Sequence, residues 1–244
     1  MPEFRRPPHR RVAGLLRRLD PGFMRRAECY FGGGTQLVMQ YGEYRVSEDI
    51  DLLCSSRAGW RMLRETVTQR SLGRLFARPV QLEREVRADR DAIRTFLRDD
   101  AGPIKLEIIV EARIDLAGAT DARLGVPVLD PASAAAEKFL ANTDRGTDEL
   151  FRARDLIDLA FLANGAGEAP LREGLSKARA AYGAAVSREL AAALRRLDED
   201  RAYYRRCIAD LAVNDEATLR RGLRTIRALQ KTAGAPRASR RPRR

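Results

Sequence analysis

The alternation of hydrophobic and polar positions divides the chain into two regions of different character. In the first region, up to about residue 125, short apolar runs are separated by turns, which is typical of β-strands joined by short connections. The expected strands are residues 27–31, 50–54 and the two arms of an antiparallel hairpin over 92–110. Helical spacing of apolar residues predicts helices over residues 9–20, 36–41 and 60–76, whereas residues 79–91 fit either a strand or a helix.

The second region is rich in alanine, leucine and arginine and shows helical spacing throughout. Its expected helices are residues 132–142, 148–163, 170–182, 186–197, 201–211 and 215–231. We therefore predict an α+β protein, with a mixed-sheet domain over residues 1–128 followed by a helical domain over residues 129–235. Both ends of the chain are basic and contain proline, so we expect a loose arm over residues 1–8 and a disordered tail over residues 236–244.

The charge of the chain is strongly positive. Lysine and arginine total 46 and aspartate and glutamate total 34, which gives a formal net charge of +12. Such an excess favours anionic partners such as nucleic acid, nucleotides or an acidic membrane face. Nearly all of the basic residues are arginines, a bias that can also follow from GC-rich coding, so the charge alone leaves both interpretations open. The lysines are Lys105, Lys138, Lys177 and Lys231.

The rarest residue types exclude several kinds of site. Cys29, Cys54 and Cys207 are too few and too widely spaced for a metal site or a disulfide framework, which suits a reducing cytoplasm. His9 is the single histidine, and we expect it to be solvated in its basic, proline-containing segment, so a histidine-based triad or zinc site is not expected. No apolar run approaches membrane-spanning length. These features predict a cytoplasmic protein without a membrane partner.

Two aspartates stand one residue apart in the segment SEDIDLL. Side chains two positions apart share one face of a strand, so Asp49 and Asp51 are expected to lie side by side. Neighbouring carboxylates repel each other unless a cation neutralises them, and Mg²⁺ prefers oxygen ligands. A pair of solvated aspartates at the end of a strand is the simpler alternative, and this short pattern does not decide between them.

A glycine turn in the segment FGGGTQL precedes the aspartate strand. Gly33 and Gly34 allow backbone N–H groups to approach a ligand closely, and the N-terminus of a following helix favours phosphate. The Thr35 hydroxyl is expected to cap that helix. The glycine spacing matches neither a Walker loop nor the dinucleotide-binding fingerprint, and a plain tight turn is the alternative.

A third carboxylate lies on a later predicted strand. Glu107 belongs to the polar face of the segment IKLEIIV, and a position beside the aspartates would allow three carboxylates to surround one or two metal ions. Lys105 shares that face and can instead form an ordinary ion pair with Glu107. Ser47 lies two residues before Asp49, either as a turn hydroxyl or as a contact to metal-bound phosphates, in which case its phosphorylation would block nucleotide binding.

Taken together, these segments resemble a known family. The order of strand, GGT, short helix and SEDIDL is similar to that of the AbiEii/AbiGii nucleotidyltransferase toxins, which belong to the polymerase-beta-type nucleotidyltransferase superfamily. That family also carries a lysine on the first helix after the sheet and then an R/K-D-x-x-D-L helix. The corresponding segments are EKFLANTDR, with Lys138, and ARDLIDL, with Asp155 and Asp158. The likeness spans about residues 27–163, and residues 165–231 match only as generic helices.

The resemblance implies roles for the matching residues. The metal ligands, for Mg²⁺ or Mn²⁺, would be Asp49, Asp51 and Glu107. The residues that bind the nucleoside triphosphate would be Gly33, Gly34, Thr35, Ser47 and Lys138. The catalytic residues would be Asp49, Asp51, Lys138 and Asp155. In these roles Lys138 would neutralise the charge of the departing pyrophosphate, and Asp155 would orient Lys138 or line the acceptor site.

The residues alone also allow simpler interpretations of the later segments. Lys138 can be a solvated side chain on an alanine-rich helix, and Asp155 can pair with Arg152 or Arg154. Asp158 lies one helical turn from Asp155 and can serve as a structural cap or ion-pair partner. The roles of these residues therefore depend on where the helices lie relative to the aspartate strand.

The implied reaction is attack of a hydroxyl on the α-phosphorus of a nucleoside triphosphate, with release of pyrophosphate. The resemblance implies a toxin that adds nucleotides to RNA, with the tRNA 3′ end as the expected acceptor, and thereby blocks translation. A cognate antitoxin protein is the expected partner. Two alternatives remain: transfer to a hydroxyl of a small molecule or protein, and a catalytically inactive module that binds RNA or a protein partner.

Overall fold

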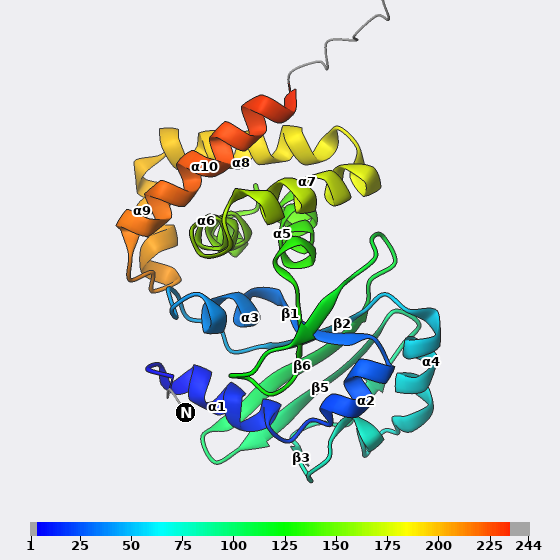
Figure 1. The fold of residues 1–244 in the computed structure, drawn as a ribbon. Coiled ribbons are helices and arrows are strands. Elements are labelled where there is room, and N and C mark those ends of the chain that lie inside the picture. The colour runs from blue at the N-terminus through cyan, green and yellow to red at the C-terminus, as the bar shows by residue number, and fades with distance from the viewer. Residues whose placement is uncertain (1–3, 235–244) are drawn as a thin grey trace, which may run out of the picture.

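The computed structural model describes residues 4–234, in which a single mixed sheet is flanked by helices (Figure 1). The sheet order is β3-β5-β6-β2-β1-β8-β7, with β4 paired to β5 as well. The strands are β1 (Cys29–Gly32), β2 (Ile50–Cys54), β3 (Gln81–Leu82), β4 (Arg87–Ala88), β5 (Ala92–Asp99), β6 (Gly102–Val110), β7 (Gly118–Thr120) and β8 (Pro127–Leu129). The α+β fold class and the predicted hairpin, formed by β5 and β6, are confirmed.

The helices of the second region form a layer on one side of the sheet, and α3 lies between that layer and β1 (Figure 1). The helices are α1 (Pro7–Leu16), α2 (Pro21–Arg26), α3 (Gly33–Gln40), α4 (Arg57–Thr66), α5 (Pro131–Arg145), α6 (Arg154–Ala166), α7 (Glu168–Tyr182), α8 (Ala185–Glu199), α9 (Arg201–Asp210) and α10 (Glu216–Gly234). No helix within residues 4–234 is long and apolar enough to cross a lipid bilayer. The division into domains at residues 128 and 129 stays a prediction, and the predicted tail lies outside the described residues.

The central strands present one buried face and one open face. On the hairpin, the buried side chains belong to alternate positions, namely Ile93, Leu97, Ile104, Leu106 and Ile108. The intervening positions face the other side, so this side carries the polar residues Arg94, Lys105 and Glu107. Strand β2 is antiparallel to β1 and parallel to β6. Strands β1 and β6 therefore lie on either side of the strand that carries Asp51.

Helix α5, which carries Lys138, has clear start signals in the sequence. The Asp130 side chain accepts a hydrogen bond of 2.6 Å from the Ser133 backbone N–H, and Pro131 occupies the first helical position. The alanine-rich stretch that follows packs against α6 and α7 and buries Phe139 and Leu140. Because these small side chains permit close packing, the polar end of Lys138 is held inside the molecule rather than in solvent.

The helix predicted over residues 60–76 is wrong in its second half. Helix α4 ends at Thr66, a short bridge joins Thr68 to Ser71, and a 3₁₀ turn covers Gly73–Leu75. The β-branched run Thr66-Val67-Thr68 disfavours helix, and Gly73 has a φ of +54°. This segment therefore forms an irregular wall beside β5 instead of a longer helix.

The expectation that His9 is solvated and that residues 1–8 form a loose arm is wrong for the described part of that segment. His9 is fully buried, and its Nδ1 lies 2.8 Å from Glu43 Oε1. The same carboxylate accepts hydrogen bonds from the backbone N–H groups of Arg5 and Arg6. Burial lowers the pKa of His9, and this outweighs the opposite effect of Glu43. The glutamate thus anchors the start of the chain, which the local sequence does not reveal.

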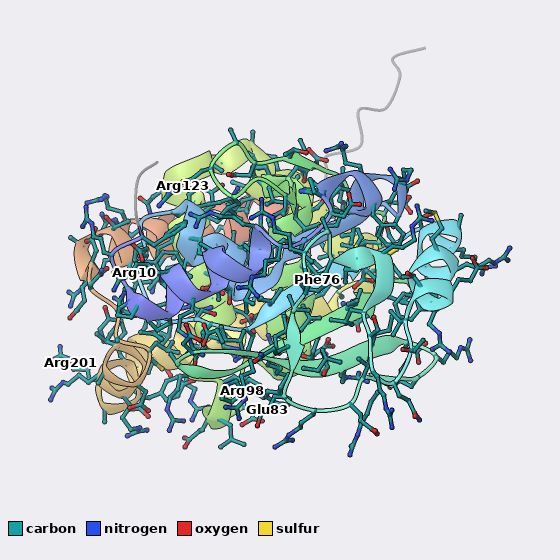
Figure 2. All side chains as sticks on the ribbon, turned by 90° about the horizontal axis from the view of Figure 1, so that it is seen from below. Arg10, Phe76, Glu83, Arg98, Arg123 and Arg201 are labelled. Carbon is teal, nitrogen blue, oxygen red and sulfur yellow. The ribbon has the colours of Figure 1, made fainter. Side chains whose placement is uncertain are left out.

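Arginine side chains occur on many elements of the fold, and those labelled in Figure 2 belong to α1, β5, the segment before β8 and α9. Several of them are engaged in ion pairs with neighbours; Arg98 on β5, for example, pairs with Glu83 on the adjoining segment. The positive charge is therefore not confined to one face, and net charge alone does not locate a binding site. A site has to be identified from local clusters of side chains.

Candidate active site

A cavity of about 420 Å³ lies where one face of β2 and β6 meets the helical layer. Seven of the nine predicted site residues line it, namely Gly33, Gly34, Ser47, Asp49, Asp51, Glu107 and Lys138. The remaining two bond directly to lining residues. Thr35 Oγ1 lies 2.8 Å from Ser47 Oγ, and Asp155 Oδ1 accepts a hydrogen bond of 2.9 Å from Lys138 Nζ. The fold therefore brings together residues that are far apart in the sequence.

The glycine turn connects β1 to α3 and places the start of that helix at the cavity. Gly33 has a φ of +71°, and a Cβ added to it would lie 2.3 Å from Asp51 Oδ2. Only glycine fits this close approach without displacing the aspartate. The predicted capping role of Thr35 is wrong, because α3 begins two residues earlier and the hydroxyl bonds to Ser47 instead. That bond joins α3 to the segment leading into β2.

Replacing Gly33 by alanine is expected to reduce stability by about 1–3 kcal/mol and to lower activity as well, because the new methyl group displaces Asp51. Gly125→Ala is the matched control. Its φ of +76° imposes similar backbone strain, but an added Cβ meets no atom within 4 Å. Urea unfolding and a transfer assay on both variants separate the two effects. If the two variants retain the same activity, the close approach at Gly33 has no bearing on the site.

The aspartate pair has the electrostatics of a cation site. Asp49 is exposed just before β2, and Asp51 is partly buried within it. Burial raises the pKa of Asp51 to about 6, the charge of Asp49 adds to the rise, and Lys138 opposes it without cancelling it. Carboxylate oxygens are the donors that Mg²⁺ takes, and it commonly uses one or two carboxylates together with substrate phosphates. The residues therefore fit the metal that the family implies.

Glu107 lies directly opposite Asp51 in the parallel pairing of β2 with β6. Its carboxylate bonds to Lys105 Nζ at 2.6 Å and to Arg94 Nε at 3.0 Å, so the simple ion pair with Lys105 does form. Within residues 4–234, no cluster of three or more histidine, cysteine, aspartate or glutamate side chains has the arrangement of a metal site. The role of Glu107 as a third ligand stays a prediction.

Lys138 is buried and held between two carboxylates. Its Nζ lies 2.9 Å from Asp155 Oδ1 and 2.7 Å from Asp158 Oδ2, so the solvated alternative is wrong. Asp155 also bonds to Arg145 Nε at 2.7 Å, rather than to Arg152 or Arg154. Burial alone would raise the pKa of Asp155, but Lys138 and Arg145 outweigh it and hold that pKa well below its usual range. Asp155 thus positions the lysine at the cavity wall.

Asp158 ties the helical layer to the sheet region. It is fully buried and accepts hydrogen bonds from Arg45 Nε at 2.7 Å, Arg45 Nη2 at 2.8 Å and Tyr44 Oη at 2.8 Å. Burial opposes its charge, yet Arg45 and Lys138 lower its pKa overall. Of the alternatives the sequence left open, Asp158 is an ion-pair partner, and Arg45 extends the charged network into the cavity.

The same cavity is also lined by Arg145, Phe151 and Arg154, to which the sequence analysis assigned no role in the site. The guanidinium carbons of the two arginines lie 4.8 and 4.9 Å from the centre of the Phe151 ring. Arg154 has no ion-pair partner among residues 4–234, and burial together with Arg145 lowers its pKa. Both arginines lie in the segments that carry the family resemblance, and Arg154 directly precedes Asp155. Their position in these segments is the feature of the sequence that could have identified them as site residues.

A glycine turn into a short helix, an aspartate pair on the neighbouring strand and a lysine from a following helical layer define the site of a nucleotidyltransferase. Two solved structures share the fold. A Helicobacter pylori protein described as a nucleotidyltransferase matches with a TM-score of 0.52 and 18% identity, over 92% of this chain and 94% of that one. The protein JHP933 from Helicobacter pylori matches with a TM-score of 0.51 and 17% identity, over 92% and 91%.

The chain belongs to the AbiEii family: the model for the nucleotidyl transferase AbiEii toxin of type IV toxin–antitoxin systems matches residues 15–231. No protein with curated annotation matches it significantly. The match extends through the helices that the sequence placed only as generic. The chain is therefore a nucleotidyltransferase of a toxin family, and the family implies an antitoxin partner and a nucleoside triphosphate substrate.

Proposed function

We propose that this protein transfers a nucleoside monophosphate from a nucleoside triphosphate to the 3′ hydroxyl of an RNA, with tRNA as the expected acceptor, and thereby blocks translation. One observation carries the proposal: the glycine turn, the aspartate pair and the buried lysine line a single cavity. Asp49 and Asp51 would hold a divalent metal ion, with Glu107 as a candidate third ligand. Such an ion supplies charge neutralisation at the triphosphate when bound.

The charges around the cavity favour a triphosphate on the side of α3 and α5. Four cations line this side, and Asp155 and Asp158 bond to three of them. The cations are Arg45, Lys138, Arg145 and Arg154. The cavity is also lined by three further carboxylates, which are grouped around Arg113: Glu111, Glu137 and Asp144. Backbone N–H groups at the start of α3 add donors for phosphate oxygens. We infer that Thr35 and Ser47 position this helix start against the segment that carries Asp49.

Residues of the cavity are also suited to position the reacting groups and to accept the proton of the attacking hydroxyl. Catalysis of phosphoryl displacement rests mainly on positioning and charge stabilisation, and Lys138 is fixed in place by two carboxylates. Asp51 and Glu107, which lie opposite each other on β2 and β6, are candidate acceptors for the proton of the hydroxyl. His9, buried against Glu43, is not among the lining residues. The arrangement therefore suits carboxylate and metal chemistry.

Arg154 is expected to bind the triphosphate directly. It lies in the first turn of α6, where the helix dipole disfavours a cation, and burial disfavours its charge further. An anionic ligand in the cavity would relieve both penalties. Arg154→Ala is therefore expected to raise the KM for the triphosphate about tenfold while leaving stability unchanged or slightly higher. Arg172→Ala, on the exposed side of α7, is the control, and steady-state kinetics with unfolding curves decide. An unchanged KM for Arg154→Ala would exclude it from phosphate binding.

The proposal is tested by incubating the protein with Mg²⁺, each of the four labelled triphosphates and total deacylated tRNA. We expect label in RNA with at least one triphosphate. Label on a small molecule or on a protein instead would replace RNA as the acceptor class. If no acceptor is labelled but Asp49→Ala remains toxic in cells, the protein acts as a binding module and the proposed function is wrong.

A further inference from the structure

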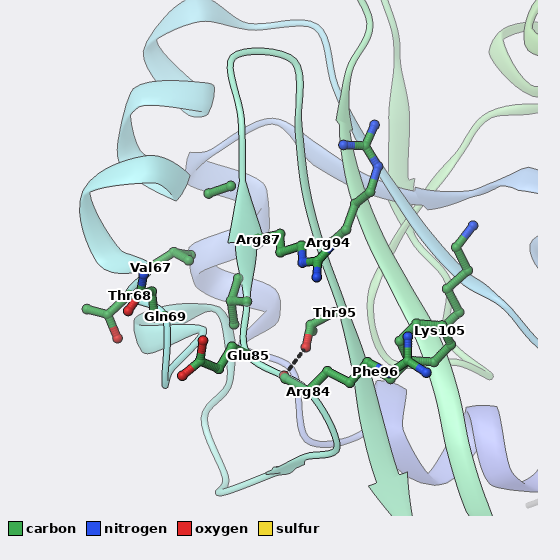
Figure 3. Close-up of a pocket in the computed structure, with 12 residues that line it drawn as sticks. Val67, Thr68, Gln69, Arg84, Glu85, Arg87, Arg94, Thr95, Phe96 and Lys105 are labelled. Atoms are coloured by element: carbon green, nitrogen blue, oxygen red, sulfur yellow. Dashed lines mark hydrogen bonds between the residues drawn. The ribbon is translucent and has the colours of Figure 1, made fainter.

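A second and larger cavity, of about 990 Å³, lies beside the active site on the open face of the sheet. Its walls are the segment 67–69, the segment 84–88 that includes β4, and the open faces of β5 and β6 (Figure 3). Lys105 lines both this cavity and the active-site cavity. The two spaces are therefore adjacent and share a wall. We call the second one the β5 groove.

The β5 groove is preformed by hydrogen bonds to the backbone. Thr95 Oγ1 donates to the Arg84 carbonyl at 2.7 Å (Figure 3). The Val86 N–H donates to the Gln69 carbonyl at 2.8 Å. The Glu83 N–H also donates to the Phe96 carbonyl at 2.7 Å. These bonds tie the 84–88 segment to β5 and to the segment that follows α4, and the cavity lies beside them. A ligand would thus meet an ordered groove rather than a collapsed loop.

The groove is strongly basic. Its lining includes Arg84, Arg87, Arg94 and Lys105 but a single carboxylate, that of Glu85. Arg94 and Lys105 pair with Glu107, whereas Arg84 and Arg87 are exposed and have no carboxylate partner in the described part of the chain. Exposed cations that form no ion pair favour a polyanion. A chain of phosphates would satisfy several of them at once.

A register row links this groove to the catalytic centre. Arg87 pairs with Arg94, Arg94 with Glu107, and Glu107 with Asp51 across strands β4, β5, β6 and β2. Adjacent strands lie about 4.8 Å apart, so Arg87 is roughly 14 Å from the aspartate strand. The next position of the row on the other side is Gly32, beside the glycine turn. The glycine turn, where we place the triphosphate, and the β5 groove therefore flank Asp51 from opposite directions.

The active-site cavity and the β5 groove each contain an aromatic side chain outside the hydrophobic core. In residues 4–234, Phe96 and Phe151 are the aromatic side chains that belong neither to the hydrophobic core nor to the layer packed on it. Phe151 lines the active-site cavity and Phe96 lines the β5 groove. The Arg84 guanidinium carbon lies 4.8 Å from the centre of the Phe96 ring. Aromatic rings and guanidinium planes are surfaces on which unpaired bases stack.

We propose that the β5 groove binds the single-stranded 3′ end of the acceptor RNA, with backbone phosphates at Arg84, Arg87 and Arg94 and a base stacked at Phe96. This inference rests on the proposed function. In the transfer, the RNA 3′ oxygen forms a bond to the α-phosphorus, the bond to pyrophosphate breaks, and the hydroxyl proton passes to a carboxylate. Attacking and leaving oxygens lie roughly in line, so the acceptor enters from the side opposite the triphosphate. That side is the β5 groove.

The test uses Arg84→Glu/Arg87→Glu, which reverses two charges without touching a described ion pair. The matched control is Arg201→Glu/Arg224→Glu, which makes the same change on α9 and α10. Figure 2 shows that Arg201 lies to one side of Arg98, a residue of β5, so the control change lies away from that strand. The probe is a short single-stranded oligoribonucleotide with a 5′ fluorescein and a free 3′ hydroxyl. Its binding is measured by anisotropy at several salt concentrations.

We expect the groove variant to bind the oligoribonucleotide at least tenfold more weakly and with a shallower salt dependence, since each lost phosphate contact lowers the slope by about 0.7. The KM for RNA should rise equally, whereas thermal stabilisation by magnesium and triphosphate should be unchanged. The control variant should behave as wild type. If wild type labels RNA and the groove variant does so with an unchanged KM, the groove assignment is wrong and the proposed function stands.

The converse outcomes are also distinguishable. If wild type binds the oligoribonucleotide through the groove but transfers no nucleotide, the proposed function fails and the binding site remains. Phe96→Ala should weaken binding of the oligoribonucleotide but not binding of polyglutamate, because only a nucleic-acid base can stack on the Phe96 ring. If polyglutamate displaces the oligoribonucleotide at equal charge concentration and Phe96→Ala has no effect, the groove is a site for an acidic protein and the RNA assignment is overturned.

Discussion

Replacing Asp51 by asparagine is expected to lower the rate of nucleotidyl transfer by about 10³-fold while leaving the protein at least as stable as wild type at neutral pH. The two effects have one cause. The carboxylate is partly buried next to Asp49, and burial together with the charge of Asp49 disfavours its ionised form and raises its pKa to about 6. A divalent cation would relieve this penalty, whereas asparagine removes both the penalty and the ligand.

The sign of the pH dependence follows from that pKa. The folded-state value lies above the unfolded value of about 3.9, so Asp51 costs stability progressively as pH rises between the two and costs most above pH 6. The Tm of Asp51→Asn should therefore exceed that of wild type at pH 7 and approach it near pH 4. Mg²⁺ should raise the Tm of wild type but not that of the variant.

The measurement is a melting curve for each protein at pH 4 and pH 7, with and without Mg²⁺, together with the transfer rate. Asp91→Asn, at an exposed position of the turn before β5, is the control and should change neither quantity. An Asp51→Asn variant that keeps more than a tenth of wild-type activity would show that this carboxylate is not part of the reaction centre.

Replacing Asp158 by asparagine is expected to destabilise the fold by about 3–5 kcal/mol, because it leaves the buried Arg45 without its carboxylate and takes one of two partners from Lys138. The lost ion pair joins two regions of the protein, since Arg45 belongs to the sheet region and Asp158 to the helical layer. Activity should fall as well, because Lys138 is then held by Asp155 alone.

Urea unfolding at pH 7 measures the effect, with Asp198→Asn as the control. Asp198 forms an exposed pair with Arg227, and the loss of such a pair costs less than about 1 kcal/mol. The double change Arg45→Met with Asp158→Leu should recover part of the stability, because neither charge is then buried alone. A loss at Asp158 no larger than that at Asp198 would mean that the buried network does not hold the two regions together.

Much of the site was predictable because its strand residues obey a period of two. That period places Asp49 with Asp51 and Lys105 with Glu107 on shared faces, and the structure adds the parallel register that sets Asp51 opposite Glu107. The glycine turn was recognisable because the required positive φ admits little else at Gly33. These features depend on neighbours in the chain.

The remaining features depend on contacts between distant segments, which local patterns do not contain. His9 was expected in solvent because nothing near it indicates Glu43, 34 residues away. Asp158 was left between a cap and a pair because Arg45 lies 113 residues from it. Arg154 is a candidate ligand-binding residue because it forms no ion pair among residues 4–234, and this can be seen only in the folded structure. The β5 groove likewise exists because α4 ends early and the following segments run beside the sheet.

The assignment of the cavity is tested most directly by comparing triphosphates labelled at the α- or the γ-phosphate, with wild type and Asp51→Asn in the presence of Mg²⁺ and tRNA. We expect that wild type transfers the α-label to RNA and releases the γ-label as pyrophosphate, and that Asp51→Asn does neither. Transfer of the γ-label to the acceptor, or equal α-label transfer by the variant, would contradict the assignment of this cavity as a nucleotidyltransferase site.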